Sequence, residues 1–136
     1  MAETTTQTIM IIEDDFFVRD LYDRAFKRKG YNTLTAVDGV EGLNKVKTNK
    51  IDIVLLDIML PKENGIDVLK EIKAPNSTVK ATPVYLLTNL GQEEIIKDAF
   101  RIGADGYLIK AKMTPDQVVA EIEAFLRGNA PKKAQV

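Results

Sequence analysis

Residues 51–57 read IDIVLLD. Apart from Asp52, every residue before Asp57 is apolar, so both faces of an extended chain are apolar here. A strand with two apolar faces is typical of the middle of a parallel sheet, where helices cover both sides. The stretch therefore predicts a buried central strand that ends in an acid.

Four further apolar runs lie at residues 9–12, 31–36, 84–87 and 107–109, and segments of helical periodicity alternate with the five runs. This alternation is typical of an α/β domain. Polar side chains dilute residues 31–36, which indicates a strand near the edge of the sheet. We therefore predict a doubly wound five-stranded parallel sheet with five helices.

Capping residues mark several of the expected helices. Asp38 and Glu41 resemble a capping box, and Thr114 and Gln117 form the same pattern around Pro115 at the start of the last helix. The helix expected at residues 65–73 ends before a proline. These local signals agree with the alternation of strands and helices.

The length of 136 residues is that of one ordinary domain. We expect a disordered segment at residues 1–7, the domain itself at residues 8–127, and a flexible tail or the start of a linker at residues 128–136. The apolar run at residues 9–12 is too short for a signal peptide or a membrane span. The prediction is a cytoplasmic domain without membrane contact.

The composition argues against several kinds of chemistry. With 19 basic and 20 acidic residues the net charge is -1, so we expect no binding to nucleic acid by this chain. The absence of cysteine excludes disulfides, thiolate zinc sites and thiol nucleophiles. The absence of histidine removes the commonest general base and the commonest transition-metal ligand.

Polar side chains stand where four of the apolar runs end: Glu13 and Asp14, Asp57, Thr88 and Lys110. The carboxyl ends of parallel strands meet at one edge of a sheet, so these side chains should gather there. Three clustered carboxylates repel one another unless a cation lies among them, and oxygen ligands alone favour Mg²⁺ or Mn²⁺. Lysine and hydroxyl groups suit an anion, such as a phosphoryl group on Asp57.

Each of these residues also has an ordinary explanation when it is taken alone. The acids at residues 13–15 form the kind of cluster that is usually a solvated turn, and Lys110 is of a type that is usually a solvated charge. Tyr107 is of a type that usually packs at a sheet edge. The coincidence of strand ends is what favours a metal site over these explanations.

The motifs, in chain order, are the acidic pair at 13–14, LLDIMLP at 55–61, NG at 64–65, LLT at 86–88 and GADGYLIK at 103–110. Their order and spacing resemble the response-regulator receiver domain of two-component signalling, of the chemotaxis-response-regulator type, from about Thr8 to Leu126. The resemblance implies a flavodoxin-like strand order 2-1-3-4-5. It also implies a phosphorylation switch that catalyses only its own phosphorylation and dephosphorylation.

The resemblance assigns a role to each site residue. Asp57 is the expected phosphoacceptor and a metal ligand. Asp14 is expected to bind Mg²⁺ or Mn²⁺ directly, Glu13 through water, and Met59 through its backbone carbonyl. No other cofactor is implied.

Thr88 is implied as the switch hydroxyl, Lys110 as the cation that pairs with the phosphoryl group, and Tyr107 as the aromatic that reports activation. The implied phosphodonor is a sensor histidine kinase or a phosphotransfer protein. A downstream protein target is expected on the face of the fourth helix, fifth strand and fifth helix. A phosphorylation-dependent homodimer is a further partner state that the resemblance leaves open.

Two positions depart from the family pattern: Asn89 replaces a small residue, and Ala111 replaces a proline that follows a cis peptide bond. They leave open a pseudo-receiver, which binds partners without phosphorylation.

Met59 and Leu90, which flank the reactive site in receivers, cannot orient a water by hydrogen bonding, so we expect a long-lived phosphoryl group. A phosphohydrolase with an aspartate nucleophile is disfavoured, because Met59 occupies the place of its second acid.

Overall fold

Strands and helices alternate along the described residues of the computed structural model, which are 6–60, 64–89 and 93–128. Most of the predicted terminal segments, residues 1–5 and 129–136, and also Pro61 and Leu90 lie outside this part. The elements are β1 (Thr8–Ile12), α1 (Phe16–Arg28), β2 (Asn32–Ala36), α2 (Gly39–Thr48), β3 (Ile53–Asp57), α3 (Gly65–Lys73), β4 (Val84–Thr88), α4 (Glu93–Ile102), β5 (Gly106–Ile109), the 3₁₀ turn η1 (Lys110–Lys112) and α5 (Pro115–Leu126).

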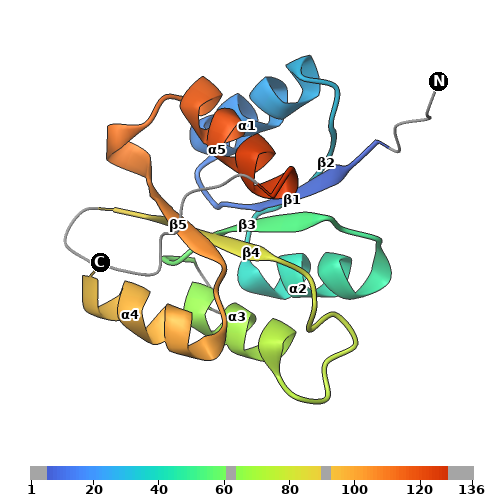
Figure 1. The fold of residues 1–136 in the computed structure, drawn as a ribbon, viewed down its shortest axis with the longest axis vertical. Helices are drawn as coiled ribbons and strands as arrows, with labels where there is room; N and C mark the ends of the chain where they lie inside the picture. The colour runs from blue at the N-terminus through green and yellow to red at the C-terminus, as the bar shows by residue number, and fades with distance from the viewer. Residues whose placement is uncertain (1–5, 61–63, 90–92, 129–136) are drawn as a thin grey trace.

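All strand pairs in the five-stranded sheet are parallel, in the order β2-β1-β3-β4-β5. This order confirms the predicted doubly wound sheet, with β3 at its centre and the polar strand β2 at one edge. Helices α1 and α5 cover one face of the sheet, and α2, α3 and α4 cover the other (Figure 1). The central strand is buried on both faces, as its sequence predicts.

The residues of β3 divide between two separate cores. Ile53 and Leu55 pack with the residues of α1 and α5, whereas Val54 and Leu56 pack with those of α2, α3 and α4. All four side chains are fully buried. Burial of an aliphatic side chain contributes about 1.5–3 kcal/mol, so β3 anchors both layers.

Strand β3 begins at Ile53, two residues later than the apolar run in the sequence. The carboxylate of Asp52 accepts a hydrogen bond from the backbone N–H of Thr8 at 2.8 Å, so this acid ties the start of β1 to the start of β3. At the other end, β3 and β4 include Asp57 and Thr88 as their last residues.

The predicted caps of α2 and α5 are present. Asp38 accepts from the N–H of Glu41, whose carboxylate accepts from Val37. Thr114 and Gln117 form a complete capping box. No helix in the described part of the chain has the length and apolar character needed to cross a bilayer.

Candidate functional site

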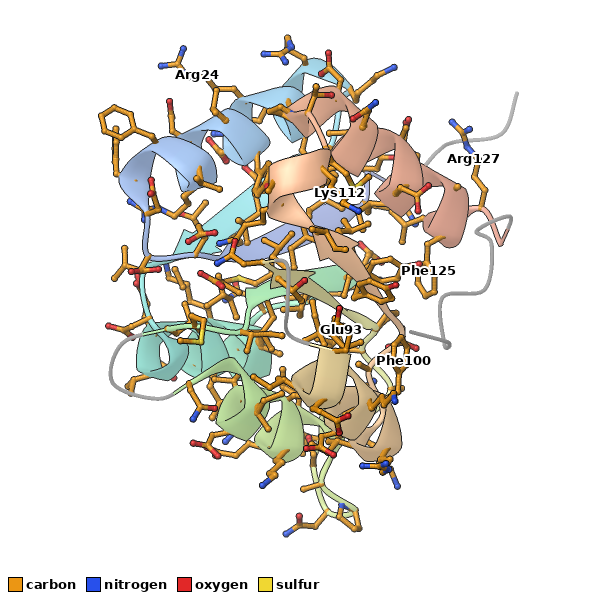
Figure 2. The ribbon with its side chains drawn as sticks, turned by 90° about the vertical axis from the view of Figure 1, so that its left-hand side faces the viewer. Arg24, Glu93, Phe100, Lys112, Phe125 and Arg127 are labelled. Atoms are coloured by element: carbon orange, nitrogen blue, oxygen red, sulfur yellow. The ribbon has the colours of Figure 1, made fainter. Side chains whose placement is uncertain are left out.

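The parallel register brings the ends of four strands to the same edge of the sheet. Ile12 is paired with Leu56 and Asp57 with Leu87, so the residue after β1 and the last residue of β3 lie at one level. Figure 2 looks at the molecule from the side on which the strands end in Figure 1, with α1 and α5 above the sheet. Side chains at or just after the ends of β1, β3, β4 and β5 therefore lie at this edge.

Three carboxylates gather at this edge. Oxygen atoms of Glu13, Asp14 and Asp57 all lie within 4.8 Å of one another. Glu13 and Asp57 are only 1% and 3% exposed, whereas Asp14 is open to solvent. The cluster offers oxygen ligands to a hard cation that approaches from the Asp14 side.

Lys110, the first residue after β5, reaches across to two of these acids. Its Nζ lies 3.0 Å from Oε1 of Glu13 and 3.3 Å from Oδ2 of Asp57. Burial lowers the pKa of Lys110, but attraction to Asp57 and Glu13 outweighs it, and the net pKa lies above its ordinary value. The side chain is therefore a fixed positive charge beside Asp57 at neutral pH.

The pKa of Glu13 is raised to about 7, first because the carboxyl group is buried and then because it contacts and is repelled by Asp57. Hydrogen bonding from the Asp15 amide, at 3.1 Å from Oε2, and from Lys110 lowers the pKa by less. A cation bound here would favour the ionised form of Glu13.

The hydroxyl of Thr88 is buried and has no hydrogen-bond partner among the described residues. Leaving a buried hydroxyl unpaired costs about 1–3 kcal/mol, so such groups are rare in folded proteins. Thr88 ends the strand beside Asp57, and an anion held on Asp57 would supply the missing acceptor.

Of the remaining predicted site residues, Met59 contacts Asp57 and Tyr107 packs against α4. The amide of Met59 donates to Oδ1 of Asp57 at 3.1 Å, and its side chain is 60% exposed beside the site. The role of its carbonyl as a metal ligand stays a prediction. Tyr107 is half-buried, with its ring centroid 6.2 Å from that of Phe100 on α4, a residue labelled in Figure 2.

The loop after Lys110 begins with a short 3₁₀ turn. No cis peptide bond occurs in the described residues, and Lys110, Ala111 and Lys112 form the turn η1. Lys110 nevertheless reaches both acids, so alanine at position 111 is compatible with the site. Asn89, the residue after β4, is exposed.

Two residues that the sequence did not single out for the site support it. A Cβ atom on Gly65 would lie 2.4 Å from the carbonyl oxygen of Asp57, and the Gly65 amide donates to Ile58 at 2.8 Å. The NG pair predicted a turn here, but not this close approach. Arg19 donates to the backbone of the acidic pair, and no local sequence pattern indicates that contact.

Comparison with known proteins identifies the family. A family model described as the response regulator receiver domain matches residues 9–123. The transcriptional regulatory proteins PhoP of Bacillus subtilis and CpxR of Escherichia coli are 34% and 36% identical over 119 residues, each match covering 88% of this chain. These matches cover 48% and 49% of the relatives, so the chain spans about half the length of the curated relatives it matches.

A solved structure agrees with this result. The receiver domain of the Francisella response regulator 1452 is similar with a TM-score of 0.80 and 27% identity, over 90% of this chain and 98% of that one. The strand order, the alternation of strands with helices and the sequence matches all indicate a receiver domain. The chain belongs to the receiver-domain family of two-component response regulators.

Proposed function

We propose that this domain is a phosphoacceptor switch in which Asp57 takes a phosphoryl group from a partner histidine kinase or phosphotransfer protein. The observation that carries the proposal is the setting of Asp57. Its buried carboxylate lies 3.3 Å from the Lys110 ammonium and shares one cluster with Glu13 and Asp14. The buried, unpaired hydroxyl of Thr88 lies at the same sheet edge.

In the proposed step, a carboxylate oxygen of Asp57 attacks phosphorus and forms the new P–O bond. The P–N bond of the phosphohistidine breaks, and its electron pair stays on the departing imidazole nitrogen of the partner. Lys110 offsets the negative charge of the transferred group, and the Thr88 hydroxyl turns to donate to one of its oxygens. Phosphoryl transfer depends mainly on positioning and charge neutralisation, so a chain without histidine can perform it.

The donor set fits Mg²⁺ or Mn²⁺ well, because the ligand atoms are carboxylate oxygens within 4.8 Å of one another. Asp14, Asp57, the Met59 carbonyl and Glu13 through water would hold the ion. When bound, the ion neutralises charge on the phosphoryl oxygens. This cluster is the reason to expect metal-dependent phosphorylation.

The surface around the site suits a protein donor better than a small molecule alone. Six large apolar side chains are exposed in the described part of the chain, and five of them follow a strand end by no more than five residues: Phe16, Phe17, Val37, Val40 and Met59. Exposed apolar groups that gather on one edge are typical of protein interfaces. The donor would cover this edge while it delivers the phosphoryl group to Asp57.

The output surface is proposed as the face formed by α4, β5 and α5. Tyr107 lies on β5 and packs against Phe100 of α4. A movement of the Thr88 side chain, on the neighbouring strand β4, would therefore be transmitted to this face. DNA binding in the names of some relatives belongs to those longer proteins and is not proposed for this segment. A cytoplasmic location and a domain spanning residues 8–127 complete the proposal.

The test is the intact mass of the protein after incubation with a small acyl-phosphate donor. Wild type with Mg²⁺ should gain one phosphoryl group, and this gain should disappear with chelator and in Asp57→Asn. Equal labelling of wild type and Asp57→Asn would contradict the assignment of Asp57. Failure of wild type to label, while it binds a donor protein, would support the pseudo-receiver instead.

A further inference from the structure

Arg19, in the second turn of α1, makes two contacts that bear on the acidic pair. Its Nη1 donates to the backbone carbonyl of Glu13 at 2.8 Å and to that of Asp14 at 3.3 Å. Both acceptors are backbone carbonyl oxygens, so these two hydrogen bonds leave the Glu13 and Asp14 carboxylates free of the guanidinium. The guanidinium carbon also lies 5.7 Å from the centroid of the Phe16 ring, which holds the group over the turn.

Other hydrogen bonds also hold this turn: the Glu13 carboxylate accepts from the Asp15 amide and from Lys110. The amide of Glu13 donates to Ala36 and thus continues the sheet by one residue, while Asp15 caps α1 by accepting from Val18. The backbone of Glu13 and Asp14 lies between those two anchors. Arg19 joins both carbonyls to the helix, and so it restricts the rotation that sets the direction of both carboxylates.

We propose that Arg19 is a positioning residue that holds the Glu13 and Asp14 carboxylates in the geometry for divalent-cation binding. The inference rests on the proposed metal-dependent phosphoacceptor function, and it adds a residue that touches neither the cation nor the phosphoryl group. Groups that orient metal ligands typically change metal affinity by about 10–100-fold when they are removed. A loss in that range is the expected effect here.

The sign of the effect separates this role from a purely electrostatic one. Arg19 carries a positive charge, so if it acted through charge alone, its removal would tighten the binding of a cation. If it acts by positioning, its removal weakens cation binding although the local charge becomes more favourable. If it only stabilises α1, the free energy of unfolding falls while the folded protein keeps its affinity for Mg²⁺.

The test compares wild type, Arg19→Met, Arg19→Lys and the control Arg24→Met. Methionine keeps the apolar stem and removes the donors, while lysine keeps the charge and one donor group. Arg24 is on the same helix with its side chain 70% exposed, ion-paired to Asp20, and it points outward in Figure 2. Calorimetric titration with MgCl₂ gives the Kd of each folded protein, without phosphorylation.

We expect Arg19→Met to raise the Kd for Mg²⁺ by about tenfold or more, Arg19→Lys to give an intermediate value, and Arg24→Met to match wild type. A second readout needs no metal: the Asp15 amide, which donates to Glu13, should exchange its hydrogen about tenfold faster in Arg19→Met in chelator. Thermal unfolding in chelator checks that each variant is folded.

An Arg19→Met protein that binds Mg²⁺ as tightly as wild type, or more tightly, overturns the inference and leaves the proposed function intact. Absence of Mg²⁺ binding by wild type refutes the proposed function and this inference together. An unchanged Asp15 exchange rate in Arg19→Met also overturns the positioning role, because the turn would then be held without the guanidinium.

Discussion

The raised pKa of Glu13 predicts how the stability of the metal-free protein depends on pH. The pKa rises from 4.5 to about 7 on folding, mainly through burial and then through Asp57. Between these values the folded state binds more protons than the unfolded state, so the free energy of unfolding falls as pH rises. At about 1.4 kcal/mol per pKa unit, the loss is on the order of 3 kcal/mol, and it is complete above pH 7.

The assay is urea unfolding in chelator at several pH values from 5 to 8, for wild type, Glu13→Gln and Glu94→Gln. The amide mimics the protonated acid, so Glu13→Gln should become more stable than wild type as pH rises, by most of that amount. Glu94, on α4 with its side chain 88% exposed, controls for loss of a carboxylate and should follow wild type. Parallel curves for wild type and Glu13→Gln would show that folding does not raise the pKa of Glu13.

Three further changes test other parts of the site. Thr88→Val should raise the free energy of unfolding by about 1 kcal/mol, because it removes an unpaired buried hydroxyl, and it should slow labelling by acyl phosphate. Gly65→Ala should lower the free energy of unfolding by about 1–3 kcal/mol in denaturant titrations, because the added Cβ meets the Asp57 backbone. Met59→Asn should shorten the lifetime of phosphorylated protein after donor removal, because the amide can orient an attacking water; an unchanged decay rate would contradict this.

The arrangement of strands could be predicted because its signals are local. Burial of β3 on both faces follows from apolar residues at both its odd and its even positions. The edge position of β2 follows from its polar residues. The start of α5 was marked by Thr114 and Gln117, whose reciprocal hydrogen bonds need only residues three apart. Convergence of the strand ends then follows from parallel pairing.

The environments within the site could not be predicted in the same way. Glu13 and Asp14 are adjacent, yet one is buried and the other exposed, because the Glu13 amide continues the sheet by bonding to Ala36. The unpaired hydroxyl of Thr88 and the contact of Gly65 with Asp57 depend on how separate elements pack. No periodicity or spacing encodes such contacts.

The proposed phosphoacceptor role of Asp57 is tested by locating the phosphoryl group. Wild type is labelled with an acyl phosphate and Mg²⁺, reduced with borohydride, which converts a phosphorylated aspartate to homoserine, and its peptides are analysed by mass spectrometry. Phosphorylation of Asp57 predicts homoserine at position 57 alone, and none in a sample labelled in chelator. Homoserine at Asp14 or at another acid, with Asp57 unmodified, would contradict it.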